Sequence, residues 1–190
     1  MHCTVQVYNG MVKKMAERID PTVPGLFLVA VIALVFGFLG LEGYLDADWG
    51  LGGVAANVAM VIGVIFVVLT VSAIRIGNAF AAALFGFVAV ALYVVQYGLA
   101  GFSPFLFYLI AIVFIVFVIV AFMIGAPKLL AIMLLFVALL YLFVGVFIAV
   151  ALGGKDPETY ALLFGIFGVL AGLVALYLSF ALSTQKLPVF

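Results

Sequence analysis

Charged residues are scarce in this chain of 190 amino acids. Lysine and arginine together number 7, aspartate and glutamate also number 7, and the formal net charge is therefore zero. Only 7% of the residues are charged, against about 25% in a typical soluble domain. So few charges cannot give an ordinary globular protein its polar surface. The zero net charge also argues against nucleic acid as a partner.

Chemically reactive side chains are equally scarce. Cys3 is the only cysteine, so an intrachain disulfide is excluded. His2 is the only histidine, and a metal centre would need ligands that the chain does not offer. The apolar stretches contain no serine–histidine, cysteine–histidine or paired-carboxylate arrangement, and no phosphate-binding loop. We therefore expect a protein that is not an enzyme and that holds no metal and no cofactor.

Long apolar runs dominate instead, because hydrophobic residues make up 71% of the chain. An α-helix needs roughly 20 apolar residues to cross ~30 Å of hydrocarbon. The clearest break between runs is Arg75-Ile76-Gly77-Asn78, which combines a charge, a glycine and a helix-capping asparagine. The predicted spans are Leu26–Leu45, Leu51–Ile74, Ala79–Ala100, Phe105–Ile124, Leu129–Leu152 and Tyr160–Leu182. This pattern predicts an all-α membrane protein, a bundle of six transmembrane helices in the lipid bilayer of the cell membrane.

The spans define a transmembrane domain at residues 26–182, between an N-terminal segment at 1–25 and a tail at 183–190. In the N-terminal segment, Val12, Met15 and Ile19 recur at helical spacing among charged residues. This spacing is compatible with an amphipathic helix on the membrane surface and equally with an unstructured tail.

The basic residues predict the orientation in the membrane. With the N-terminus in the cytoplasm, only Lys155 lies outside. The other six basic residues, Lys13, Lys14, Arg18, Arg75, Lys128 and Lys186, then lie inside. This asymmetry follows the positive-inside rule and places both termini in the cytoplasm.

Small residues predict how the helices pack, because lipid-embedded helices associate where their backbones approach closely. Gly165, Gly168 and Gly172 form one stripe along the last span, which we expect to pack against another helix. The span Phe105–Ile124 has few small residues and is expected to face lipid or a neighbouring subunit. Two segments, Phe36–Gly40 and Phe164–Gly168, are weakly similar, which is a faint sign of an internal repeat.

Few polar side chains lie in or beside the spans. For most of them an interhelical hydrogen bond is the simplest role; they are Asn57, Thr70, Ser72, Gln96, Ser179, Tyr93, Tyr141 and Tyr177. Asn78 stands at a helix start, where free N–H groups can meet an anion. A plain helix cap is an equally good interpretation of Asn78.

At these residues the chain resembles the acetate uptake transporter family, which includes the succinate–acetate permeases. Where that family has Asn-Pro-Ala-Pro-Leu-Gly-Leu, this chain has Asp20-Pro21-Thr22-Val23-Pro24-Gly25-Leu26. Where it has Gly-Asn-Thr-Phe-Gly, this chain has Gly77-Asn78-Ala79-Phe80-Ala81, and Phe85 matches a family phenylalanine. Gly165-Ile166-Phe167-Gly168 and Tyr177 are similar to the family's last helix. The likeness extends over nearly all of the six spans.

The resemblance implies a urea-channel-like arrangement of the helices, with one pore in each protomer of a homo-oligomer, a hexamer. It places Asn78, Phe80, Phe85 and Tyr177 along the solute pathway. It also places a hydrophobic constriction at Val29, Val88 and Val137, with Phe27 and Phe87 close by. Two positions depart from the family, because its helix-two glutamine and glutamate are replaced here by Phe66 and Ala73.

The leading hypothesis from the sequence is a membrane channel or transporter for a small monocarboxylate such as acetate, possibly moved with a proton. We keep two alternatives. One is a channel for a neutral small solute such as urea or a short amide. The other is a structural membrane subunit that transports nothing, with a closed pore.

Overall fold

The computed structural model describes residues 20–45, 48–98 and 103–184, with the backbone alone at 96–98. Within these ranges every regular element is an α-helix. The helices are α2 (Thr22–Leu45), α3 (Leu51–Arg75), α4 (Ala79–Gly98), α5 (Phe105–Met123), α6 (Lys128–Leu152) and α7 (Glu158–Thr184). They coincide closely with the six predicted spans, so the prediction of an all-α six-helix bundle is confirmed. The predicted amphipathic helix and Lys186 lie outside the described residues.

The largest difference from the predicted boundaries is at the start of α2. Helix α2 begins at Thr22, within the segment that we assigned to the N-terminal region. The carboxylate of Asp20 accepts a hydrogen bond from the Thr22 N–H at 2.9 Å. Pro21 and Pro24 stand where a helix lacks internal N–H partners, so proline there costs no hydrogen bond. The helix can therefore start earlier than hydropathy alone indicates.

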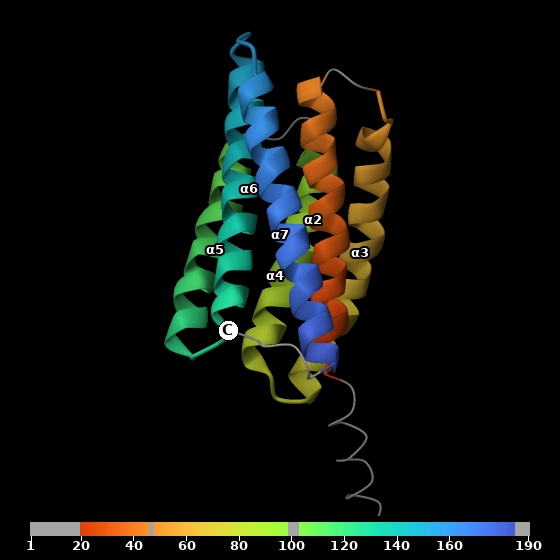
Figure 1. The fold of residues 1–190 in the computed structure, drawn as a ribbon, viewed down its shortest axis with the longest axis vertical. Helices are drawn as coiled ribbons and strands as arrows, with labels where there is room; N and C mark the ends of the chain where they lie inside the picture. Colours follow the sequence, from red (N-terminus) through yellow and green to blue (C-terminus); the bar gives the residue numbers. More distant parts are fainter. Residues whose placement is uncertain (1–19, 46–47, 99–102, 185–190) are drawn as a thin grey trace, which may run out of the picture.

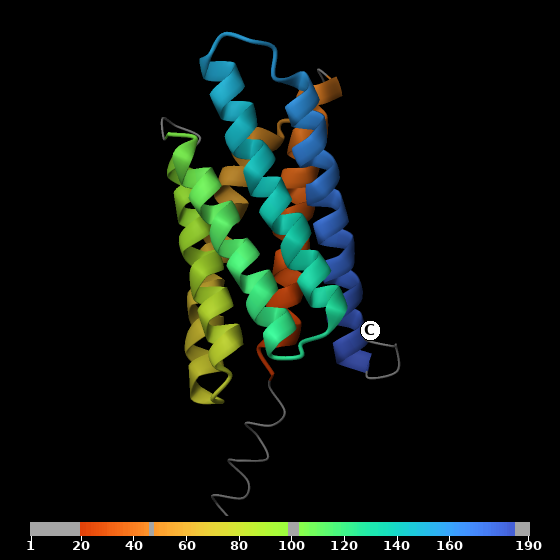
Figure 2. The same ribbon diagram turned by 90° about the vertical axis from the view of Figure 1, so that its left-hand side faces the viewer.

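The helices stand side by side along the long axis of the molecule (Figures 1 and 2). The chain enters α2 and leaves α7 at one end, which also carries the α3–α4 and α5–α6 turns. The opposite end carries the α2–α3 and α6–α7 connections. We call the first the basic end, because Arg75 and Lys128 lie there, and the second the acidic end, after Glu42, Asp48, Asp156 and Glu158.

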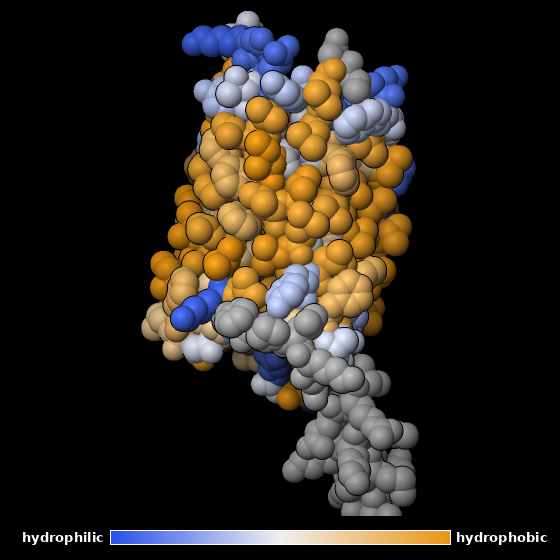
Figure 3. Space-filling model, viewed as in Figure 1, coloured by the Kyte–Doolittle hydropathy of each residue, from blue (hydrophilic) through white to orange (hydrophobic). Residues whose placement is uncertain are grey.

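The lengths and surface of the helices suit a membrane. Five of them are long and apolar enough to cross a bilayer, and the described apolar part of α4, Ala79–Val95, is shorter. Figure 3 shows a largely apolar surface across the middle of one face, with hydrophilic residues gathered toward the two ends. The chain is a multi-pass membrane protein.

The turn between α3 and α4 has the features that the sequence predicted. Gly77 has φ 78°, a backbone conformation that glycine adopts without strain. The Asn78 N–H donates to the Ala73 carbonyl at 2.9 Å, which closes the end of α3. The Asn78 side-chain oxygen accepts the Ala81 N–H at 3.0 Å, which caps the start of α4.

The glycine stripe of α7 packs against α2, and this is the most extensive helix contact among the described residues. A Cβ atom added to Gly168 would lie 2.6 Å from the Gly37 Cα atom, and one added to Gly165 would lie 3.1 Å from the Gly37 carbonyl oxygen. The Ser179 hydroxyl also joins the two helices by donating to the Val23 carbonyl at 3.1 Å. We call this contact the α2–α7 seam.

Helix α5 buries one face and exposes the other. Phe107, Ile110, Ala111 and Phe114 are buried. The opposite face is exposed along much of its length, at Leu109, Ile112, Ile115, Val116 and Ile119. This second face is the one that we expect to meet lipid or a neighbouring subunit.

Candidate solute pathway

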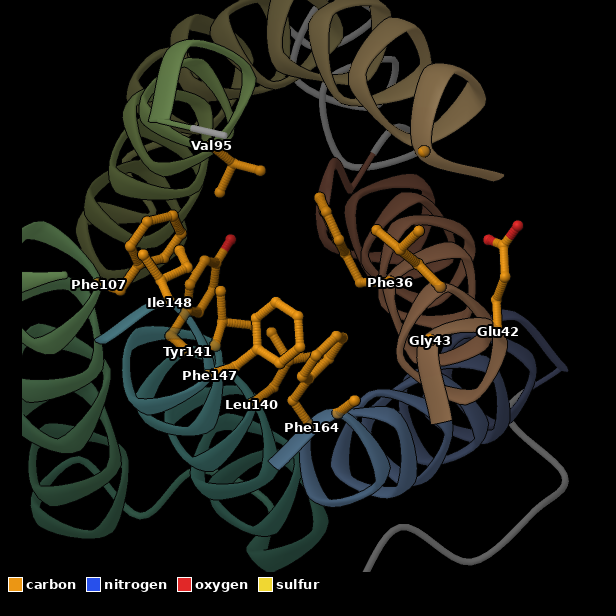
Figure 4. A pocket seen from close by; sticks show the side chains of 14 residues that line it. Phe36, Glu42, Gly43, Val95, Phe107, Leu140, Tyr141, Phe147, Ile148 and Phe164 are labelled. Atoms are coloured by element: carbon orange, nitrogen blue, oxygen red, sulfur yellow. The ribbon is translucent and has the colours of Figure 1, made fainter. Parts of the chain in front are cut away.

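Two cavities lie inside the bundle. The larger, which we call the vestibule, has a volume of about 410 Å³ and lies toward the acidic end. Figure 4 shows its lining as a group of aromatic and aliphatic side chains contributed by α2, α4, α5, α6 and α7. The lining residues are Phe36, Leu39, Glu42, Gly43, Gly52, Val95, Phe107, Leu140, Tyr141, Val144, Phe147, Ile148, Ala161 and Phe164.

The smaller cavity, which we call the inner cavity, has a volume of about 40 Å³. On the scale of roughly 10–15 Å³ for one water, it has room for a solute the size of a few waters. Its lining comes from α2, α4 and α6, with Phe114 from α5. The residues are Leu26, Val29, Ile32, Ala33, Phe36, Leu84, Phe85, Val88, Leu92, Phe114, Met133, Leu134, Val137, Leu140 and Tyr141.

Three residues, Phe36, Leu140 and Tyr141, line both cavities. The vestibule and the inner cavity therefore meet at these side chains, which we call the neck. Phe36 comes from α2, whereas Leu140 and Tyr141 are consecutive residues of α6. The two cavities follow one another from the acidic end toward the middle of the bundle, with the neck side chains between them.

Three predicted constriction residues come together in the inner cavity. Val29, Val88 and Val137 all line it, and each is at most 8% exposed. Helices α2, α4 and α6 therefore each contribute one valine to the same space. The lining of the inner cavity includes no residue of α3, whereas the vestibule lining includes Gly52 at the start of α3.

Phe85 lies at the part of the inner cavity nearer the basic end. Its ring occupies the space beside Gly25, where any Cβ atom would collide with it. On its other side it contacts Phe66 of α3, with ring centroids 5.6 Å apart. Phe66 is fully buried. Phe66 therefore fills this region with an apolar ring that supports Phe85.

The other predicted pathway residues lie away from both cavities. Phe27 is 46% exposed and Tyr177 is 36% exposed, so their side chains face outward. A constriction at Phe27 within one protomer does not fit this exposure. Phe80 packs edge-on against Phe117, with ring centroids 6.0 Å apart. Phe87 packs against Phe114 and Phe117 at 5.3 and 5.9 Å.

Asn78 also lies outside both linings. It stands at the basic end, half-buried, and its side-chain oxygen is engaged in capping α4. The structure thus shows the capping role. An added contact with an anion at this position stays a prediction.

Tyr141 is the pathway residue that sequence reasoning undervalued. It is 6% exposed, and its ring stacks on Phe114 with centroids 5.6 Å apart and planes 10° apart. In Figure 4 its oxygen points into the space between Val95 and Phe36. The one available signal was a tyrosine within an otherwise apolar span, which we read as an interhelical hydrogen bond.

Glu42 lies at the rim of the vestibule, on the side of α2 away from the aromatic group (Figure 4). One carboxylate oxygen accepts the N–H groups of Trp49 and Leu51 at 2.8 and 3.4 Å, so Glu42 secures the start of α3. A carboxylate at a helix N-terminus is favourable to the helix dipole. Glu42 is the only charged side chain in either described lining. No group of three or more potential metal ligands exists in the described part of the chain.

The fold and these cavities define a class: an α-helical multi-pass membrane protein with apolar internal cavities. The bundle is similar to the solved structure of the bacterial acetate channel SatP. The TM-score is 0.68, the sequence identity is 14%, and the match covers 90% of this chain and 99% of the channel's chain. At this identity the match establishes a shared fold. No protein-family model and no curated protein matches the sequence.

Proposed function

We propose that this protein is a membrane channel or transporter for a small monocarboxylate such as acetate. The observation that carries the proposal is the pair of cavities that meet at Phe36, Leu140 and Tyr141, in a fold shared with an acetate channel. The resemblance of the sequence to acetate transporters supports the same solute class.

The lining determines which form of the solute can pass. Removing an isolated carboxylate from water into apolar surroundings is very costly. The described linings offer no positive side chain to offset that cost. The neutral, protonated acid should therefore cross more easily than the anion. Its short aliphatic part suits walls of valine, leucine and phenylalanine, and conduction needs only weak binding.

Uptake of labelled acetate by liposomes containing the purified protein tests the proposal. We expect uptake faster than in empty liposomes, and faster still as the pH falls toward the pKa of the acid. Val88→Trp should reduce uptake to the level of empty liposomes, because an indole would fill the inner cavity. The matched control is Val90→Trp on the same helix, where the side chain is 59% exposed and faces away from the cavity. This control should transport like the unaltered protein.

The remaining hypotheses are outcomes of the same assay. Uptake of urea or acetamide without uptake of acetate would replace the proposal by a neutral-solute channel. Solute uptake equal to that of empty liposomes at every pH would support the other alternative, a structural membrane subunit with a closed pore. Equal inhibition by the two tryptophan variants would show that the inner cavity is not the route.

The proposal includes orientation and assembly. We infer that both termini lie in the cytoplasm, which is supported by the basic residues at one end of the bundle. That places the vestibule on the outer side of the membrane. We also infer assembly into a homo-oligomer, a hexamer by the resemblance to the acetate uptake transporter family.

A further inference from the structure

We propose that the Tyr141 hydroxyl is the hydrogen-bonding group that holds the carboxyl of the solute at the neck. The inference rests on the proposed function and adds a specificity-determining residue to it. Sequence resemblance assigns no role to Tyr141, and the structure points to it through burial, an unpartnered oxygen and its place between two cavities.

Tyr141 is 6% exposed, yet its oxygen makes no hydrogen bond with any group in the described residues. A buried tyrosine hydroxyl usually finds a partner, because leaving one unpaired in an apolar environment costs free energy. Tyr141 thus retains the desolvation cost of its hydroxyl without an internal bond that would offset it.

The Tyr141 oxygen lies at the edge of the cavity. The Glu42 Oε2 atom is the one fully enclosed, unpartnered side-chain oxygen or nitrogen among the described residues. The Tyr141 oxygen therefore keeps accessible surface, and in Figure 4 the oxygen points into the cavity. The face-to-face stack on Phe114 holds the ring, so the hydroxyl has a fixed direction. Among the described residues, Tyr141 supplies the only polar side chain in the lining of the inner cavity.

The Tyr141 hydroxyl and a protonated carboxylic acid have complementary hydrogen-bonding groups. A hydroxyl can donate one hydrogen bond and accept others. A protonated carboxylic acid carries both an accepting carbonyl and a donating O–H, so one acid molecule can pair with Tyr141 while its alkyl group contacts Phe36 and Leu140. A single hydroxyl cannot compensate for burying a full carboxylate charge. The neck should therefore favour the neutral acid over both its anion and a purely apolar molecule of the same size.

Tyr141→Phe removes this oxygen and keeps the ring, so it tests the inference directly. We expect the acetate concentration at half-maximal uptake to rise roughly two- to tenfold, the range expected for one net hydrogen bond. Acetic acid at acidic pH should also raise the melting temperature of the unaltered protein more than that of the variant, because a ligand stabilises the state that it binds. The control is Tyr93→Phe, which removes the hydroxyl of a 37% exposed tyrosine on α4.

The outcomes separate the two proposals. A structural role for the hydroxyl predicts a lower melting temperature in Tyr141→Phe with unchanged half-saturation, and that result would overturn the inference. We expect the opposite, because the described residues lose no hydrogen bond. If Tyr141→Phe and Tyr93→Phe both transport acetate like the unaltered protein, the inference fails and the channel stands. If the unaltered protein does not transport acetate, the proposed function itself fails.

Discussion

At the scale of single residues, angular position on a helix decides which side chains can meet a solute. Val29 lines the inner cavity, whereas Phe27 is 46% exposed. A helix has 3.6 residues per turn, so residues two apart in the sequence are rotated by about 200° around the helix axis. The side chains of Phe27 and Val29 therefore point to nearly opposite sides of α2. Phe87 and Val88 differ by about 100° for the same reason. Val88 lines the cavity, and Phe87 packs between helices instead.

This geometry explains what could be predicted about the pathway. Aligning this chain with the motifs of the acetate uptake transporter family was sufficient to predict that Val29, Val88 and Val137 lie together. It could not place Phe27 and Phe87, which were included because they stand close to Val29 and Val88 in the sequence. Phe36 and Tyr141 were missed, because nothing in an apolar span shows which side chains face an internal space. Contacts with other helices decide that, and such contacts are not visible in one sequence.

At the scale of single residues, we predict how the replacement of Asn78 changes the stability of the protein. Asn78→Ala removes the oxygen that accepts the Ala81 N–H and should lower the free energy of unfolding by about 1 kcal/mol, the usual value of a helix cap. Unfolding in detergent micelles by added denaturant measures the change. Asn78→Asp keeps an accepting oxygen and should restore most of the stability. Asn57→Ala is the control, because Asn57 is exposed on α3. A stable Asn78→Ala protein would mean that the cap contributes little.

At the scale of elements, glycine determines which helices join. The α2–α7 seam pairs Gly37 with Gly168 and Gly40 with Gly165. One number falls as the other rises, so the two helices run in opposite directions. These residues belong to the similar segments Phe36–Gly40 and Phe164–Gly168. The stripe on the last span was visible in the sequence, but its partner was not, because several spans carry small residues and only the fold selects among them.

Gly168→Leu tests the seam. The added side chain would collide with the Gly37 backbone, and overpacking of this kind typically costs about 1–3 kcal/mol. We expect a lower melting temperature in detergent, or protein that aggregates during purification. Gly53→Leu adds the same side chain where no atom lies within 4 Å and should leave the melting temperature nearly unchanged. Equal stability of the two variants would contradict the role of the seam.

At the scale of the whole molecule, the number of crossings could be predicted from the sequence, because charge, proline or glycine separates the spans. Orientation has a weaker basis, since it depends on the side on which a few lysines and arginines fall. The structure brings Arg75 and Lys128 to the end where α2 begins and α7 ends. These two basic residues therefore both favour placing this end of the bundle in the cytoplasm, as the positive-inside rule predicts.

Single cysteines, introduced after Cys3→Ser, test the orientation. Asp48 and Asp156 are exposed at the acidic end. Asp48→Cys and Asp156→Cys should react with an impermeant maleimide added to intact cells. Arg75→Cys, at the opposite end, should react only after the cells are permeabilised. The reverse labelling pattern would show that the protein has the opposite orientation in the membrane, with the vestibule facing the cytoplasm.

The α2–α7 seam also has a consequence for biogenesis. The ribosome makes α2 first and α7 last among the described helices, and α3 to α6 are synthesised between them. Helix α2 must therefore wait in the membrane without its largest partner, its glycine surface open to lipid or to a membrane chaperone. This contact forms late, because it cannot form before α7 has been synthesised. The nascent protein should accordingly remain vulnerable to degradation until α7 has been inserted.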